Sequence, residues 1–91
     1  MEQEFEWDEK KAELNFRKHG VMFETAATVF FDENRLEYYD YEHSTDEDRF
    51  ITIGMADSVL FVVYTVRYPK TRIISARLAN ERERKMYYGI I

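Results

Sequence analysis

The sequence predicts an α+β fold in a single domain covering residues 1–91: a short amino-terminal strand, two helices, an antiparallel four-strand meander and a carboxyl-terminal helix. Three observations lead to this prediction. Apolar residues recur at helical spacing before residue 32, aromatic and β-branched runs follow residue 35, and a helix-start motif stands at residues 80–83. A chain of 91 residues supports one hydrophobic core, so we expect no second domain.

The first two helices are predicted from their ends and from their apolar spacing. Asp8 can cap a helix over residues 9–18, and Gly20 supplies the left-handed residue expected after its end. A second helix is predicted from apolar residues at i, i+3, i+4, i+7 and i+8, namely Phe23, Ala26, Ala27, Phe30 and Phe31. We expect these side chains to face the core, together with Trp7.

Four strands are predicted after the second helix. Their β-branched and aromatic runs are Leu36 to Tyr41, Phe50 to Met55, Val59 to Val66 and Thr71 to Arg77. Residues 56–58 and 68–70 are the expected turns, and residues 42–48 form a polar connection. Asn80 and Glu83 have the spacing of a capping box, so a last helix begins there, with Met86 and Tyr87 facing inward.

Packing all helices on one face of the sheet would leave the other face for a ligand. The distribution of charge along the chain bears on whether that ligand is an anion. The chain has a net charge of -5, but residues 67–91 hold seven basic and two acidic side chains, a local charge of +5. A basic surface on an acidic body can concentrate an anionic ligand, although solvated surface charge is an equally good explanation of the asymmetry.

Several classes of protein are disfavoured by what the sequence lacks. There is no cysteine, no zinc-ligand spacing, no Gly-rich phosphate loop and no nucleophile elbow. We therefore expect neither a metal nor a cofactor. The amino terminus is acidic, and no apolar run approaches the ~18 residues of a membrane span, so we expect an untargeted cytoplasmic protein without membrane contacts.

Three groups of residues resemble the signatures of the BrnT toxin family, in order and over nearly the whole chain. The first group is Trp7-Asp8, Lys11, Asn15, Lys18-His19-Gly20-Val21, Phe23-Glu24, Ala26 and Val29-Phe30. The second is His43-Ser44, Glu47, Arg49 and Ile53-Gly54. The third is Ile73-Ile74-Ser75-Ala76-Arg77, Ala79, Glu83 and Tyr87.

This resemblance implies a RelE-like fold and a metal-independent endoribonuclease that halts translation. It also implies neutralisation by a BrnA-type antitoxin, whose DNA-binding domain would bring the complex to DNA only indirectly. Two positions depart from the family pattern. Val66 replaces a frequent acidic residue, which weakens any proposal of a general base there, and Met22 replaces a small polar helix cap.

Metal-free RNA cleavage needs a base for the 2′-hydroxyl proton, cations for the transition state and an acid for the leaving oxygen. Our candidate catalytic residues are His19, Lys18, Glu47, Arg49 and Arg77. Arg67, Arg72 and Tyr87 are the candidate RNA-binding residues, because guanidinium groups bind phosphate and aromatic rings stack on bases. His43, in the polar connection, is a weaker candidate for proton transfer.

Each candidate also has a structural interpretation. His19 and Lys18 are equally typical of a helix end, and Glu47 of a solvated surface. Arg77 has the alternative of a structural ion pair with Glu83. Two other functions therefore stay open. One is a catalytically inactive protein-binding module with the same fold, and the other is a small structural domain, which would leave the basic carboxyl-terminal region unexplained.

Overall fold

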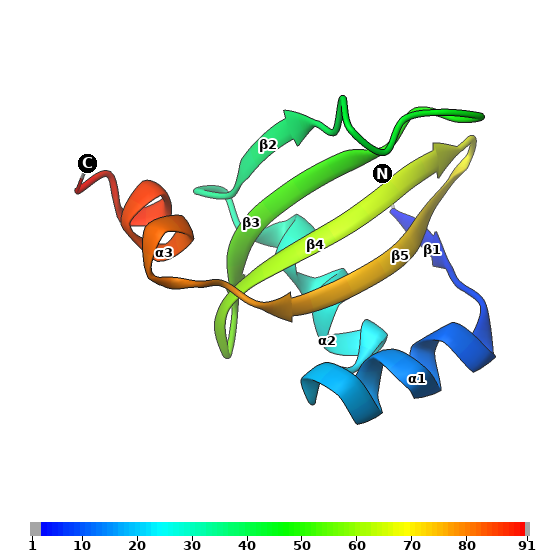
Figure 1. Cartoon of the computed structure of the whole chain (residues 1–91), viewed down its shortest axis with the longest axis horizontal. Coiled ribbons are helices and arrows are strands. Elements are labelled where there is room, and N and C mark those ends of the chain that lie inside the picture. Colours follow the sequence, from blue (N-terminus) through cyan, green and yellow to red (C-terminus); the bar gives the residue numbers. More distant parts are fainter. Residues whose placement is uncertain (1–2, 91) are drawn as a thin grey trace.

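A computed structural model describes residues 3–90 as a five-stranded sheet with three α-helices and one 3-10 helix (Figure 1). The elements are β1 (Glu4–Glu6), α1 (Glu9–His19), α2 (Phe23–Thr28), η1 (Val29–Phe31), β2 (Leu36–Tyr39), β3 (Phe50–Ala56), β4 (Ser58–Arg67), β5 (Lys70–Leu78) and α3 (Glu81–Tyr88). The strand order across the sheet is β1-β5-β4-β3-β2.

The sheet is mixed, because a fifth strand joins the antiparallel ones. Strands β2 to β5 pair antiparallel in chain order, as expected, but β1 adds to the edge of β5 in parallel, with Phe5 opposite Thr71. The predicted four-strand meander and the short amino-terminal strand are therefore both present, but the pairing of β1 with β5, which makes one five-stranded mixed sheet, was not predicted. A three-residue segment is too short to reveal its pairing by alternation, whereas the open edge of β5 offers backbone groups that need partners.

The predicted second helix is shorter than its apolar spacing suggested. It ends at Thr28 and continues as the 3-10 turn η1, whose tighter winding rotates Phe31 out of the core, so that this side chain is 67% exposed. Strand β2 also ends early, at Tyr39 rather than Tyr41. The Asp40 N–H still donates to the Arg49 carbonyl, and the chain then turns away.

The predicted helix ends are confirmed. The Asp8 side chain accepts the Lys11 N–H at 3.1 Å, and Gly20 adopts a φ of 71° at the end of α1. Asn80 and Glu83 form the expected capping box at the start of α3. Trp7 packs edge-on against Phe23, with 6.0 Å between the ring centroids.

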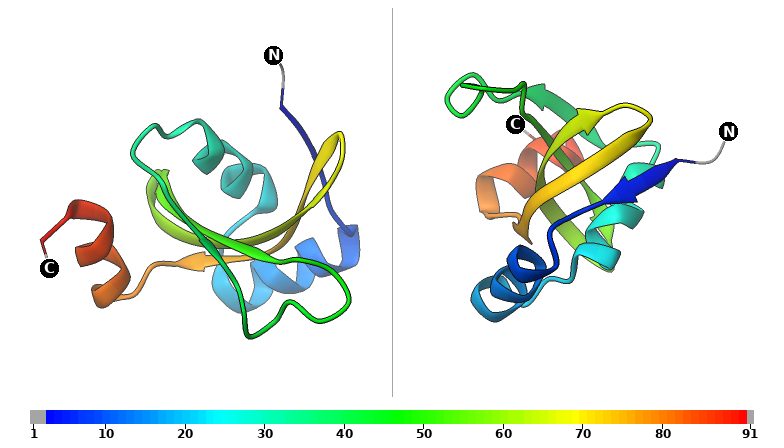
Figure 2. Two further views of the ribbon diagram at one scale, coloured as in Figure 1. Left: turned by 90° about the horizontal axis from the view of Figure 1, so that it is seen from above. Right: turned by 90° about the vertical axis from the view of Figure 1, so that its right-hand side faces the viewer.

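The two faces of the sheet carry different layers (Figures 1 and 2). One face packs against α1, α2 and η1 through a buried cluster that includes Phe23, Val29, Leu60, Val62 and Ile73. Helix α3 contacts β3 and β4 on the opposite face, over Ile53, Val59 and Ala79. The prediction that all helices share one face was therefore wrong. Alternation along β4 allows both layers, because Val59 and Leu60 point to opposite sides and both are buried.

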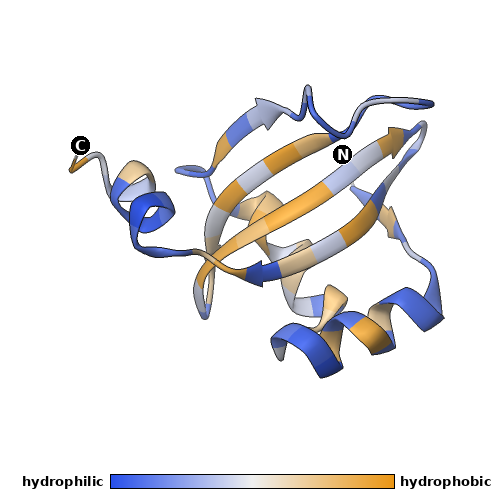
Figure 3. Ribbon diagram, viewed as in Figure 1, coloured by the Kyte–Doolittle hydropathy of each residue, from blue (hydrophilic) through white to orange (hydrophobic). Residues whose placement is uncertain are grey.

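Asn15 joins α1 to the part of the β5 edge that β1 does not cover. Its side-chain oxygen accepts the Ala76 N–H at 3.1 Å, and its amide nitrogen donates to the Ala76 carbonyl at 2.8 Å and to the Val21 carbonyl at 3.0 Å. The buried amide thus satisfies the backbone of Ala76 as a neighbouring strand would. Figure 3 shows why α1 needs this polar anchor, because hydrophilic residues cover much of the helix.

The backbone of β3 passes so close to η1 that only glycine fits at position 54. A Cβ atom built on Gly54 would lie 2.6 Å from Cγ1 of Val29 and 2.9 Å from Cβ of Arg35. Both are side-chain atoms only one or two bonds from the backbone, so neither can move away as the end of a long side chain could. Packing alone therefore explains the glycine of the Ile53-Gly54 pair, and no catalytic role is needed to account for it.

We predict that Gly54→Ala lowers the free energy of unfolding by about 1–3 kcal/mol, because the added methyl group must push η1 away from the sheet. Urea denaturation followed by circular dichroism measures this change. Glu33→Ala, in the exposed turn after η1, is the control and should alter stability by less than about 0.5 kcal/mol. A Gly54→Ala protein as stable as the control would contradict the packing argument.

Candidate functional site

The face of the sheet that α1 and α2 do not cover carries four of the predicted arginines. We call it the open face, defined by Val63, Thr65 and Arg67 of β4 with their neighbours on β3 and β5. Arg77 lies opposite Phe61, and Arg72 opposite Thr65. Arg49 precedes β3 with the parity of Ile51. Alternation along the strands did not predict which set of side chains is covered by helices. Leu60, Val62 and Tyr64 of β4 are buried under α1, α2 and η1, so the odd-numbered residues of β4 face the other side.

Three of these arginines are held by carboxylates. Arg67 bonds Glu47 with a shortest N–O distance of 3.0 Å, and Arg72 bonds Glu6 at 2.8 Å. Arg77 makes two parallel bonds to Glu83, at 2.8 and 2.9 Å, and its guanidinium lies 4.0 Å from the centroid of the Phe61 ring. The ion pair with Glu83, which was the structural alternative for Arg77, is therefore present.

Glu47 links several predicted site residues electrostatically. The hydrogen bond from Arg67 is the main reason that the pKa of this carboxyl lies below its ordinary value, and the charges of Arg67, Arg49 and Arg72 lower it further. Glu47 is thus an anion near neutral pH and a proton acceptor rather than a donor. The open face brings together four predicted residues from three distant segments: Glu47, Arg49, Arg67 and Arg72.

Arg49 differs from the other arginines of the open face. Within residues 3–90 its guanidinium forms no hydrogen bond or ion pair. It lines a hollow of about 150 Å³, which we call the Arg49 hollow, together with Asp40, His43, Val63, Ile74 and Ser75. A β-bulge between β4 and β5 turns both Ile74 and Ser75 toward it.

His43 stands in the Arg49 hollow beside a buried carboxylate. Its Nδ1 lies 3.1 Å from Oδ2 of Asp40, whose side chain is only 8% exposed, while the His43 side chain is 61% exposed. Ser44 fixes the loop by donating to the Asp40 carbonyl at 2.6 Å and accepting the Arg49 N–H at 2.8 Å. A carboxylate on Nδ1 leaves Nε2 of the exposed imidazole available for proton transfer.

From the sequence, His19 was a stronger candidate than His43, and Asp40 was not predicted to belong to the site. Asp40 lies three positions before His43, and that spacing was the available signal. The sequence did not indicate that Asp40 is buried, because Asp40 stands in a polar stretch. Its burial is what distinguishes the pair from two ordinary surface residues. The geometry therefore moves the candidate histidine from α1 to the loop before β3.

Lys18 and His19 lie away from this cluster. Both stand at the end of α1, about one turn beyond Asn15, beside the edge of β5. Among the residues that the structure describes, neither side chain hydrogen-bonds or pairs with another. The structure does not bring them together with Arg49, which lies before β3 and two strands away in the sheet.

Comparison with known proteins identifies the chain. Residues 7–83 match the family described as ribonuclease toxin, BrnT, of type II toxin-antitoxin systems. This chain belongs to the BrnT family. Membership implies an RNA target and an antitoxin partner. None of the curated proteins matches the chain.

The fold agrees with a solved BrnT structure. The 1.1 Å crystal structure of the Brucella abortus ribonuclease toxin BrnT superposes with a TM-score of 0.68 at 20% sequence identity. The match covers 88% of this chain and 100% of the other. The mixed sheet with helices on its two sides is therefore the BrnT fold.

Position 66, where this BrnT chain departs from the family pattern, does not belong to the open face. Val66 lines a hollow with Arg35, Glu37 and Tyr64 on the opposite face of the sheet, the face that α1, α2 and η1 cover. An acidic residue there would point away from Arg49 and His43. The departure consequently removes no carboxylate from the candidate site.

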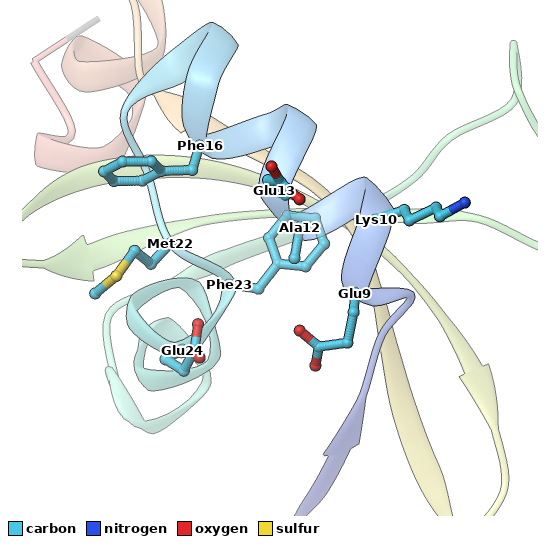
Figure 4. Close-up of a pocket in the computed structure, with 8 residues that line it drawn as sticks. All are labelled: Glu9, Lys10, Ala12, Glu13, Phe16, Met22, Phe23 and Glu24. Carbon is cyan, nitrogen blue, oxygen red and sulfur yellow. The ribbon is translucent and has the colours of Figure 1, made fainter.

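A larger groove between α1 and α2 has unsuitable charge for RNA. It measures about 360 Å³, and Figure 4 shows the carboxylates of Glu9, Glu13 and Glu24 around the rings of Phe16 and Phe23. Carboxylates repel the phosphates that dominate RNA affinity. The open face, with its arginines, is the better candidate for the ribonuclease site of this BrnT protein.

Residues 3–90 contain no cluster of three or more His, Cys, Asp or Glu side chains placed to hold a metal ion. No helix in this range is long and apolar enough to cross a membrane.

Tyr87, predicted to bind RNA, is used within the fold. Its hydroxyl donates to Oδ2 of Asp32 at 2.6 Å, which raises the pKa of Tyr87 to about 12. Burial raises the pKa of the Asp32 carboxyl, but bonds from Tyr87 and from the Met55 and Asn34 N–H groups outweigh it, so the net shift is downward. The bond holds α3 against the sheet.

We predict that Tyr87→Phe lowers the free energy of unfolding by about 1–2 kcal/mol near neutral pH, because the Asp32 carboxylate loses one donor. A depressed pKa in the fold means that this stabilisation is complete above about pH 5 and is lost as the pH falls through the folded value, below the ordinary 3.8. Urea unfolding at pH 7 and pH 3 measures both effects, and the difference from the unmodified protein should shrink at pH 3.

Tyr88→Phe is the matched control, because the Tyr88 side chain is 55% exposed and its hydroxyl bonds no other described residue. Equal losses in the two variants at pH 7 would mean that the bond to Asp32 does not anchor α3.

Proposed function

We propose that this chain is a metal-independent endoribonuclease of RelE-like fold that cleaves messenger RNA on its open face and thereby halts translation. The observation that carries the proposal is the Arg49 hollow, where an unpaired guanidinium and the Asp40–His43 pair share one small space. Such a hollow combines a phosphate-binding cation with an imidazole that can accept a proton from a hydroxyl group.

In the proposed reaction, Nε2 of His43 takes the proton of the 2′-hydroxyl group while Asp40 holds the ring through Nδ1. The 2′-oxygen then forms a bond to phosphorus, and the bond between phosphorus and the 5′-oxygen breaks. The leaving oxygen takes a proton from solvent. The products are a 2′,3′-cyclic phosphate and a 5′-hydroxyl end, and Arg49 offsets the charge that develops on the phosphorane oxygens.

The other arginines of the open face are assigned to binding. Arg67 and Arg72 place further guanidinium groups along β4 and β5, and their carboxylate partners fix their orientation. Glu47, kept anionic by Arg67, orients that cluster. Arg77 and Tyr87 act as positioning residues, because both hold α3 in place. Lys18 and His19 have no part in this mechanism.

The antitoxin partner is proposed to be of the BrnA type and to neutralise the toxin by covering the open face. Attachment to DNA would then come only through the antitoxin. A protein that cleaves messenger RNA acts where translation takes place, so we propose that it works in the cytoplasm. Loss of activity with retention of antitoxin binding would define the alternative, a catalytically inactive binding module of the same fold.

We predict that His43→Ala and Arg49→Ala each reduce RNA cleavage about 100-fold or more, since the first removes the proton acceptor and the second a transition-state cation. The measurement is the rate at which new 2′,3′-cyclic phosphate ends appear in purified RNA with excess EDTA. In bacteria that express the chain, both variants should relieve growth arrest.

Arg17→Ala is the matched control for charge, because Arg17 lies on α1 and is exposed beside Glu13. It should cleave like the unmodified protein. His19→Ala decides between the two histidines: a large loss there, with His43→Ala fully active, would overturn the assignment to the Arg49 hollow. Cleavage that EDTA abolishes would refute metal independence.

We also predict that an antitoxin of the BrnA type shields Arg49 and Arg67 from modification by phenylglyoxal, while Arg17 reacts as before. Mass spectrometry of the modified peptides, with and without the partner, measures this protection. Unchanged reactivity of Arg49 in a saturated complex would show that the antitoxin does not cover the open face.

A further inference from the structure

A second hollow opens beside the Arg49 hollow, under α3. It has a volume of about 220 Å³, and we call it the α3 pocket. It is lined on one side by strands of the sheet and on the other by α3 and its N-cap residue. The lining residues that matter here are Tyr38, Ile51, Phe61, Asn80, Arg82 and Met86.

The two hollows are neighbours on the open face. Ile51 of β3 lines the α3 pocket, and its cross-strand partner Val63 of β4 lines the Arg49 hollow. Directly opposed residues of an antiparallel pair have Cα atoms only about 4.5–5.5 Å apart. The two hollows are therefore close enough for one ligand to place a phosphate at Arg49 and its next group in the α3 pocket.

The pocket has the chemistry of a site for a flat heteroaromatic ring. Ile51 and Phe61 give it an apolar floor, and Tyr38 presents an aromatic side chain at its rim. Asn80 and Arg82, both exposed, place hydrogen-bonding groups at its mouth. Bases of single-stranded RNA are bound in this way, by apolar and aromatic contacts to the ring and polar contacts to its edge.

The pocket is also built to keep its shape. Arg77 covers the Phe61 ring and is held by two bonds to Glu83 of α3. The bond of Tyr87 to Asp32 anchors the other end of the same helix. Ion pairing and packing thus fix the wall that carries Met86, which is the arrangement expected of a preformed ligand site.

We propose that the α3 pocket binds one base of the RNA, next to the phosphate that is cleaved, and so sets the sequence preference of the toxin. This inference rests on the proposed cleavage at Arg49 and His43. Its recognition residues are Tyr38 and Met86 for the ring, above the apolar floor that includes Phe61, and Asn80 and Arg82 for its edge.

The first test measures binding without cleavage. The four nucleoside 3′-monophosphates, ribose 5-phosphate and inorganic phosphate are titrated into the protein and followed by NMR. We expect at least one nucleotide to bind about tenfold more tightly than ribose 5-phosphate, because base stacking adds to phosphate binding. Equal affinity for all six probes would overturn the proposal.

Two variants locate this preference. Met86→Trp fills the pocket, and Tyr38→Ala removes its aromatic rim without disturbing a buried residue, since Tyr38 is 37% exposed. Both should abolish the preference for the nucleotide and leave phosphate binding unchanged. Met22→Trp and Tyr88→Ala are matched controls at exposed sites outside the pocket and should bind like the unmodified protein. Controls that lose the preference equally would overturn the assignment.

A second test separates this inference from the proposed function. Sequencing of 2′,3′-cyclic phosphate ends in total RNA gives the base preference on each side of the cleaved bond. We expect Tyr38→Ala to reduce a preference at one flanking position at least threefold while cleavage continues. Continued cleavage with unaltered preference in both pocket variants refutes the base site alone, whereas absence of cleavage by the folded, unmodified protein refutes the ribonuclease proposal.

Discussion

The Asp32 carboxylate connects three parts of the molecule that are far apart in the sequence. It accepts the Asn34 N–H at 2.9 Å, the Met55 N–H at 2.8 Å and the Tyr87 hydroxyl at 2.6 Å. The end of the helix layer, the edge of β3 and α3 are thereby tied together. The close approach that excludes a side chain at Gly54 belongs to the same junction, because Oδ2 of Asp32 would lie 3.3 Å from an added Cβ atom.

The position of α3 decides the shape of the open face. With α3 anchored, Glu83 reaches Arg77 and Met86 stands over the sheet, so that one end of the face becomes a pocket rather than a flat surface. Glu83 and Tyr87 of α3 therefore act mainly by positioning other side chains. A sequence motif that includes Arg77, Glu83 and Tyr87 is explained by this framework of contacts.

The charge arrangement explains how an acidic chain can gather four arginines on one face of its sheet. Arg67, Arg72 and Arg77 are each matched by a carboxylate, which limits the electrostatic cost of gathering them and fixes their side chains. Exposed pairs of this kind contribute little to stability, so their main effect is on orientation. Arg49 has no such partner among the described residues, so its guanidinium group stays available to an anionic ligand beside His43 and Asp40.

Local signals in the sequence determined the helices, their caps and the four antiparallel strands, because capping and alternation depend on neighbouring residues. The family and the set of arginines were also evident there. The parallel pairing of β1, the placement of α3 across the sheet and the exposed position of Phe31 depended on tertiary packing. So did the grouping of His43, rather than His19, with Arg49, because burial of Asp40 and the distance between segments have no local signature. Sequence thus determined which chemical groups are available, and only the fold decided which of them meet.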